Sequence, residues 1–207
     1  MNNSKAEFSP FLDEEDGSKV YRFEEYKYVE LGTTTNKIQK EEIEYDRYEV
    51  YLTNTIESSP HYSGLCSLLR SSKGFDVFNF YLANHGGSCH GLIALINAIF
   101  DAAGTINMIV ASPSASAAAT LALCGDSLTF CDHTFLMFHN YSSSVYGKGQ
   151  ELKDNIRASD EWINDYMRNL HQPFLTAAEC SRIEKDNDVH VFYNDKTLDA
   201  RIKRHFK

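Results

Sequence analysis

Residues 75–110, FDVFNFYLANHGGSCHGLIALINAIFDAAGTINMIV, carry the clearest pattern of secondary structure in the chain. Its first part, residues 75–82, is an apolar and aromatic run that is typical of a buried strand. The glycine turn NHGGS follows at 84–88, and the mostly apolar residues 90–104 then predict a helix that ends at a glycine. A second strand is predicted at 106–110. This order of elements predicts two parallel strands joined by a right-handed crossover.

The same alternation of strands and helices continues on both sides of this stretch. Residues 48–53, YEVYLT, alternate between apolar and polar side chains as a strand does. A helix is expected next, with Ser59 as its N-cap and Pro60 at its first helical position. Two further short strands are expected at 127–131 and 134–139. We therefore predict an α/β fold made of layered βαβ repeats.

A long charged helix is predicted from about Lys148 to Leu170. It carries a narrow apolar stripe, which packs either on the domain's own core or on a partner helix. The stripe consists of Leu152, Ile156, Ile163, Tyr166 and Leu170. Another helix follows, in which Thr176 and Glu179 have the spacing of a capping box. A short strand at 189–193 and a basic helix are expected to end the chain.

The composition excludes several classes of protein. A net charge of −9 argues against a nucleic-acid-binding protein, because phosphate contacts require clustered Lys and Arg. No apolar run reaches the roughly 18 residues needed to cross a bilayer, and the first residues lack the apolar stretch of a secretory signal. Five cysteines without a CxxC pair favour reduced thiols in the cytoplasm over a disulfide framework or a zinc site. We expect neither a metal nor another cofactor.

The chain is expected to contain one folded domain preceded by an extension. Residues 1–45 are rich in Asp, Glu and Lys, and their apolar residues are scattered aromatics without a clear period. This composition predicts a charged N-terminal extension that is at most partly ordered. Residues 46–207 are long enough to bury a core of their own and are interpreted as the functional domain.

Ser116 is the candidate nucleophile. It lies in the small-residue stretch 110–125, VASPSASAAATLALCG, after a predicted strand and directly before a predicted helix from Ala117 to Leu123. A side chain at a helix N-terminus lies near free N–H groups and the positive end of the helix dipole, which favour developing negative charge. The competing interpretation is that Ser116 only caps the helix and that the alanines only pack.

Two other features favour catalysis over capping. Gly86 and Gly87 directly follow a predicted strand and offer flexible backbone N–H groups at the same end of the sheet, as an oxyanion hole requires. His139 ends a later apolar strand, so the carboxyl edge of the sheet is expected to present its imidazole near Ser116. A serine hydroxyl beside a base and amide donors indicates nucleophilic catalysis.

The order of these motifs resembles the proteolytic subunit of the Clp protease. The likeness covers roughly residues 48–192 and includes the Gly-Gly turn, the segment ASAA before a small-residue helix, a strand ending in histidine, the long helix, and IEKDNDVHVF at 183–192. The resemblance implies a ClpP/crotonase-like fold with a protruding long helix. It also implies a serine endopeptidase in which Ser116 is the nucleophile, His139 the base and Asp186 the third member of the triad.

The resemblance further implies an oxyanion hole and an assembly. Backbone N–H groups of Gly86 or Gly87 and of Ala117 would hold the oxyanion. Members of this family form homo-oligomeric rings that enclose the active sites, and the helix from Lys148 to Leu170 would interlock one ring with the other. The implied substrates are peptides and unfolded proteins, and an AAA+ Clp ATPase is the implied partner, with no nucleic acid and no membrane involved.

The chain departs from the family pattern beside two of its motifs. Asn84-His85 replaces the family's Ser-Pro before the Gly-Gly pair, and Asn140 replaces Gln-Pro after the histidine. These altered flanks motivate a second hypothesis, a catalytically silent structural or regulatory subunit of a Clp-type assembly. A third hypothesis is a crotonase-type enzyme that acts on acyl thioesters through its oxyanion hole alone.

Cys89 is a competing candidate for the nucleophile. The segment GSCHG at 87–91 follows a predicted strand and precedes a predicted helix, which is the sequence context of a nucleophile elbow. The favoured interpretation is a buried cysteine in the first turn of a core helix. The elbow hypothesis leaves the ordered serine, histidine and aspartate motifs unexplained.

Overall fold

The computed structural model describes residues 10–12, 19–21, 46–144, 146–194 and 196–206. In the N-terminal part, β1 (Pro10–Leu12) pairs antiparallel with β2 (Lys19–Tyr21). The prediction of a partly ordered extension over residues 1–45 otherwise lies outside the described residues. The candidate site and the elements that form it lie within residues 46–206.

A four-stranded parallel sheet forms the centre of this region. Its strand order is β3 (Arg47–Leu52), β4 (Val77–Leu82), β5 (Thr105–Val110) and β7 (Ser127–Phe130), and each neighbouring pair is parallel. The strands predicted from the sequence are confirmed with small shifts at their ends. Alternate side chains bury one face of this sheet, because successive residues of a strand point to opposite faces.

The other face of the sheet carries a row of hydrogen-bonded polar side chains. Asn79 donates to Glu49 over 2.9 Å, Asn107 donates to Asn79 over 3.0 Å, and Ser127 donates to Asn107 over 2.7 Å. These residues are also direct partners in the register of the four strands. Since a slip of one residue would move each side chain to the opposite face, the row favours a single register.

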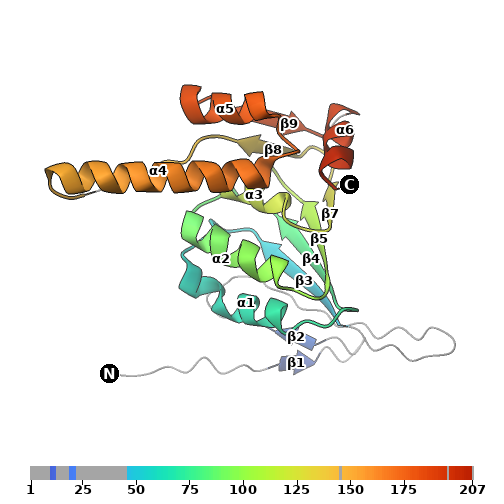
Figure 1. Cartoon of the computed structure of the whole chain (residues 1–207). Coiled ribbons are helices and arrows are strands. Elements are labelled where there is room, and N and C mark those ends of the chain that lie inside the picture. Colours follow the sequence, from blue (N-terminus) through green and yellow to red (C-terminus); the bar gives the residue numbers. More distant parts are fainter. Residues whose placement is uncertain (1–9, 13–18, 22–45, 145, 195, 207) are drawn as a thin grey trace, which may run out of the picture.

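Two helical segments cover the buried face of the sheet (Figure 1). The first consists of η1 (Ser59–Tyr62) and α1 (Ser63–Arg70), and the second is α2 (Cys89–Phe100). In α2, the buried side chains recur at helical spacing and join the core that the strands form; they are Leu92, Leu95, Ile96 and Ile99.

The ends of these two helical segments differ from the predictions. The N-cap of η1 is Ser58 rather than Ser59, and it makes no side-chain capping bond. Pro60 is therefore the second residue of this segment rather than the first, and the first turn is a 3-10 helix. Helix α2 ends at Phe100, before the predicted end at Gly104. Gly104 instead packs against the backbone of Asp76, where an added Cβ would come within 2.7 Å of the carbonyl oxygen.

A second, three-stranded sheet lies beside the first. It consists of β6 (Ser114–Ala115), β8 (Phe135–Phe138) and β9 (His190–Tyr193), with β6 parallel and β9 antiparallel to β8. Helix α3 (Ala117–Ala122) begins almost directly after β6, and all of its residues are buried. Its small side chains allow close approach of neighbouring backbone. The sequence did not predict β6.

The long helix α4 (Gly149–His171) projects from the body of the molecule (Figure 1). Near its C-terminal end, Met167 and Leu170 pack against the core. Farther from the body, Ile156 and Trp162 leave 47% and 49% of their surface exposed. The apolar stripe predicted for this helix therefore packs on the domain's own core only at one end.

Two shorter helices complete the described region. Helix α5 (Ala177–Asp186) begins with the predicted capping box, in which Thr176 and Glu179 exchange side-chain and backbone hydrogen bonds. Helix α6 (Lys196–His205) follows β9. Its Arg201 forms an ion pair with Glu179 at 2.8 Å, which links the last two helices.

The molecule therefore belongs to the α/β class, with a parallel sheet whose strands alternate with helices. The buried side chains of both sheets and of the helices form one core cluster. No helix in the described part of the chain combines the length and the apolar character needed to span a membrane. All five cysteines are free thiols.

Candidate active site

Three chain segments meet at the edge of the sheets where Ser116 lies. They are the turn after β4, the end of β6 and the end of β8. The backbone N–H of Ala115 donates to the carbonyl oxygen of Asn84 over 3.2 Å, and the N–H of Ser116 donates to that of Met137 over 2.8 Å. These bonds bring the glycine turn, Ser116 and the strand before His139 to one place, as the sequence predicted.

Ser116 has an unusual backbone conformation and a hydroxyl that does not cap its helix. Its φ is 57° and its ψ is −126°, a combination that costs a residue with a Cβ on the order of 1–3 kcal/mol. It occupies the N-cap position of α3, yet its side chain makes no capping hydrogen bond. The capping interpretation therefore lacks the bond that would explain this serine, whereas strain of this kind is concentrated at functional sites.

The glycine turn packs directly against Ser116. A Cβ added to Gly86, which has a φ of 92°, would come within 2.7 Å of the Cβ of Ser116 and 2.8 Å of the nitrogen of Ala117. The N–H of Gly86 donates to the side-chain oxygen of Asn84 over 2.9 Å, so it is not free to bind an oxyanion. Of the predicted donors, this leaves the amides of Gly87 and Ala117.

The backbone around Gly87 explains why its amide is free. Ile56 bridges Gly87 in parallel: its N–H donates to Gly86 over 2.8 Å, and its carbonyl oxygen accepts from Ser88 over 2.7 Å. In this pattern the N–H of Gly87 points away from Ile56. No described residue accepts a hydrogen bond from Gly87 or Ala117. Both amides are therefore unpaired; Ala117 directly follows Ser116, and Gly87 follows Gly86, which packs against Ser116.

His139 follows β8 and lines the same small cavity as Ser116. Its Nδ1 lies 2.6 Å from the backbone carbonyl oxygen of Asn140. Because a carbonyl oxygen only accepts hydrogen bonds, Nδ1 carries the proton and Nε2 is left unprotonated in the neutral ring. This is the tautomer that a general base needs toward a serine hydroxyl.

Asp186 does not reach this cavity. It is the last residue of α5, its side chain is exposed, and it makes no hydrogen bond or ion pair with another described residue. The segment around it is nevertheless attached to the turn after His139. The side chain of Asn140 donates to the carbonyl oxygen of Glu184 over 3.3 Å and to the side chain of Asn187 over 3.0 Å.

Glu184 is the carboxylate that lines the cavity with Ser116 and His139. Arg168 of α4 binds it in a two-pronged ion pair, in which Nε lies 2.9 Å from Oε1 and Nη2 contacts Oε2. Both oxygens of this carboxylate are already bound by the guanidinium. Glu184 is therefore a poor substitute for Asp186 as the partner of an imidazole.

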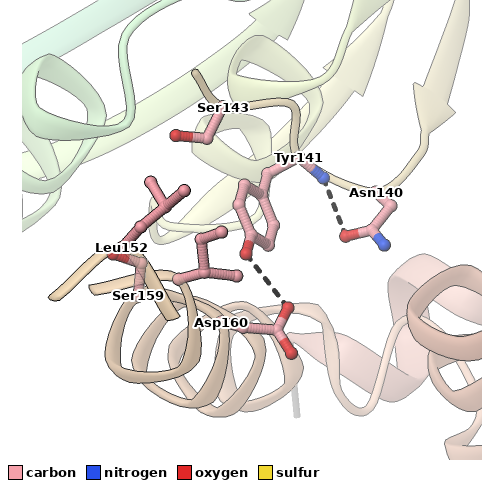
Figure 2. A pocket seen from close by; sticks show the side chains of 7 residues that line it. Asn140, Tyr141, Ser143, Leu152, Ser159 and Asp160 are labelled. Atoms are coloured by element: carbon pink, nitrogen blue, oxygen red, sulfur yellow. Dashed lines mark hydrogen bonds between the residues drawn. The ribbon is translucent and has the colours of Figure 1, made fainter. Parts of the chain in front are cut away.

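The cavity shared by Ser116 and His139 is small. Its volume is about 50 Å³, which corresponds to room for one or two water molecules. Asn140 and Tyr141 line it and also line a larger neighbouring groove of about 360 Å³ (Figure 2). A water or a reacting carbonyl group fits the small cavity, and larger groups fit only the groove.

Cys89 also lines the small cavity but lacks the features of an elbow nucleophile. It is the first residue of α2, and the Ser88 hydroxyl caps that helix by accepting from Gly91. Its φ is not positive, unlike that of Ser116. Burial raises the pKa of the Cys89 thiol, which disfavours the reactive thiolate. The strained strand-to-helix turn is at Ser116 and not at Cys89.

Thr120 and His171 are site residues that the sequence did not reveal. The Thr120 hydroxyl lies 2.9 Å from Nε2 of His171, the last residue of α4, and 3.3 Å from the carbonyl oxygen of Ser116. Both side chains line the cavity. Burial, together with the nearby His205, lowers the pKa of His171 to about 4. No local pattern predicts this contact, because its residues lie far apart in the chain.

No family model matches the chain, and no curated protein matches it. The described residues include no group of three or more His, Cys, Asp or Glu side chains that could hold a metal ion.

Proposed function

We propose that this protein is a serine endopeptidase of the Clp proteolytic-subunit type, with the ClpP/crotonase-like fold. The observation that carries the proposal is the strained, uncapped Ser116 next to the free amide of Ala117, with His139 lining the same cavity. Each of these features costs stability or leaves a polar group unpaired. Together they form the set of groups that hydrolysis of a peptide bond requires.

The proposed reaction uses these groups as follows. Nε2 of His139 accepts the proton of the Ser116 hydroxyl as its oxygen attacks the peptide carbonyl. The amides of Gly87 and Ala117 donate to the oxygen on which negative charge develops, and loss of one such donor costs about 3 kcal/mol. His139 then protonates the leaving amine, and water hydrolyses the acyl-enzyme by the same steps in reverse.

Asp186 completes the triad in this proposal. In the present arrangement the carbonyl oxygen of Asn140 holds the proton-bearing Nδ1 of His139. A neutral carbonyl fixes the tautomer but stabilises an imidazolium less well than a carboxylate does. We therefore propose that His139 turns from Asn140 to Asp186, whose carboxylate is unpaired among the described residues. Asn140, the residue after His139, hydrogen-bonds to Glu184 and Asn187, which lie on either side of Asp186 in the sequence.

The same proposal includes an assembly in the cytoplasm. Subunits associate into rings that enclose the sites, and α4 interlocks one ring with the other. Unfolded proteins are the substrates, delivered by an AAA+ ATPase. The half-exposed side chain of Trp162 on α4 is consistent with such contacts.

Cleavage of short fluorogenic peptides tests the proposed activity. We expect wild-type protein to cleave them and Ser116→Ala to lose activity by at least about 10³-fold. Ser112→Ala is the matched control, because Ser112 is half-buried in the preceding loop and has no proposed role. Asp186→Asn should lower kcat by about 10³-fold or more with little change in KM. Activity that survives in Ser116→Ala would refute the proposal.

A catalytically silent subunit of a Clp-type assembly is the second candidate. The observation that favours it is the position of Asp186, whose carboxylate lies outside the cavity of Ser116 and His139. This candidate predicts a folded, assembled protein in which Ser116→Ala and Asp186→Asn change nothing in peptide cleavage. Light scattering on the same samples shows whether absence of cleavage accompanies an intact assembly.

A further inference from the structure

The groove beside the candidate site lies between the segment after β8 and the first half of α4 (Figure 2). Its volume is about 360 Å³, within the range of about 300–1,000 Å³ that is common for ligand pockets. Asn140, Tyr141 and Ser143 line one side, and residues of α4 line the other. Asn140 and Tyr141 also line the cavity of Ser116 and His139, so the groove adjoins the reacting groups.

The walls of the groove suit a long side chain with a polar tip. Leu152 and Ile156 supply an apolar surface on α4, and Ser143 and Ser159 supply hydroxyl groups. Asp160 is the charged residue among those that line the groove. An aliphatic stem can lie along the apolar wall while its end reaches the carboxylate.

The Asp160 carboxylate is held in place without being neutralised. The Tyr141 hydroxyl and the Asn164 side-chain amide both donate to its Oδ1, each over 3.0 Å. No cationic side chain among the described residues lies within ion-pair distance of it. The closest cation in sequence, Arg157, pairs instead with Asp154. Oδ2 of Asp160 thus remains available to a ligand.

The contact with Asp160 also affects the phenol of Tyr141. Burial, followed by the hydrogen bond to Asp160 and its charge, raises the pKa of Tyr141. The phenol is therefore a donor to Asp160 across the physiological pH range. Two neutral donors orient the carboxylate and leave its charge uncompensated.

We propose that this groove binds a lysine or arginine side chain next to the scissile bond, and that Asp160 determines this preference. The inference rests on the proposed peptidase function for its place in the reaction, but the binding step does not require catalysis. The cationic group pairs with Oδ2 of Asp160, and its stem lies against Leu152 and Ile156. An uncharged side chain of the same length gains the apolar contact alone.

Binding to the Ser116→Ala variant tests the preference without hydrolysis. The probes are acetyl-Ala-Ala-Ala-Arg-Ala-Ala-amide and the same peptide with norleucine in place of arginine, compared by titration calorimetry or NMR. We expect the arginine peptide to bind at least about fivefold tighter, the size of a partly exposed ion pair. Adding Asp160→Asn should remove this difference, since the amide keeps the shape and loses the charge.

Asp165→Asn is the matched control, because Asp165 is an exposed acid on the same helix that does not line the groove. It should leave the preference for arginine unchanged. Equal binding of the two peptides to Ser116→Ala, or an equal loss of preference in both aspartate variants, would overturn the inference. Retained folding is checked by circular dichroism, and the norleucine peptide should bind all variants alike.

Cleavage by the wild-type protein separates this inference from the proposed function. Hydrolysis that depends on Ser116 but shows no preference for Lys or Arg refutes the inference and leaves the function standing. A preference for arginine in binding, without any hydrolysis by wild-type protein, refutes the function and leaves the groove as a binding site for basic side chains. Preference in both measurements, lost with Asp160, supports both.

Discussion

At the residue scale, the site depends on a strained serine and the glycine that gives it room. Ser116 adopts a φ of 57° although it carries a Cβ, and Gly86 approaches it with a φ of 92°. A side chain at Gly86 would collide with Ser116 and with the backbone on both sides of it. The glycine is needed for the shape of the site rather than as an amide donor, since Asn84 binds its N–H.

Gly86→Ala should therefore destabilise the protein and disturb Ser116. The added Cβ would lie 2.8 Å from the carbonyl oxygen of Ala115, and we expect a loss of about 2 kcal/mol in the free energy of unfolding. Gly74→Ala is the control, because a Cβ there meets nothing within 4 Å. Urea denaturation measures both. Equal stability of the two variants would contradict this description of the turn.

The sequence predicted Ser116 and His139 at one edge because each follows a predicted strand, although β6, the strand directly before Ser116, was not predicted. It did not reveal which glycine amide is free, because that depends on the Asn84 side chain. The orientation of the Asp186 side chain could not be predicted from the sequence either. Whether a carboxylate at the end of α5 faces inward depends on tertiary contacts, such as the pairing of Glu184 with Arg168.

At the element scale, the contact between α3 and the end of α4 fixes the first turn after Ser116. His171 is fully enclosed, bonds to Thr120 and packs its ring edge-on against Phe138 at 5.0 Å. A buried neutral imidazole can act as a hydrogen-bonding strut only while it stays uncharged. We therefore expect the contact between Thr120 and His171 to depend on pH.

The stability contribution of His171 should be lost in acid. Its pKa in the folded protein is lowered from 6.5 to about 4, so the unfolded chain binds the extra proton between these values. Stability from this residue is present above pH 6.5 and falls as pH drops toward 4. Between pH 7.5 and pH 5, wild-type protein should lose about 2 kcal/mol more than His171→Gln.

Urea denaturation at the two pH values measures this difference, and His90→Gln is the control because His90 is exposed on α2. An equal loss of stability in wild-type and His171→Gln proteins would show that His171 is not the buried neutral residue described here. The comparison between variants removes the contribution of the carboxylates, which all three proteins share.

Long periodic elements were predictable and short ones were not. The unit formed by β4, α2 and β5 followed from apolar runs separated by glycines, and the capping box located the start of α5. The strand β6 has two residues, too few to show a periodic pattern. The hydroxyl of its buried Ser114 donates to the backbone carbonyl oxygen of Ser112. Helix α2 ended before Gly104 because that glycine is used for close packing against Asp76.

At the scale of the whole molecule, α4 is the element that extends farthest from the two packed sheets (Figure 1). Trp162 of this helix is half exposed and stacks on Tyr166 with ring centroids 6.3 Å apart. An extended helix with such a surface is suited to contacts between subunits. In the proposed assembly, these side chains are buried between copies of the chain.

Trp162→Glu should therefore weaken the assembly without unfolding the subunit. Light scattering should show a lower mass than for wild-type protein at the same concentration, while circular dichroism stays unchanged. Phe75→Glu is the matched control, since Phe75 is 63% exposed and precedes β4, away from α4. A mass that changes equally in both variants, or in neither, would count against α4 as the contact.

The most direct test of the central claim is covalent labelling of the nucleophile. Folded wild-type protein is treated with a fluorophosphonate probe, and the modified residue is located by peptide mass spectrometry. We predict modification at Ser116, slowed by at least about 100-fold in His139→Ala and absent in Ser116→Ala. A folded sample that stays unlabelled at Ser116, or that carries the label at another residue, would contradict the account.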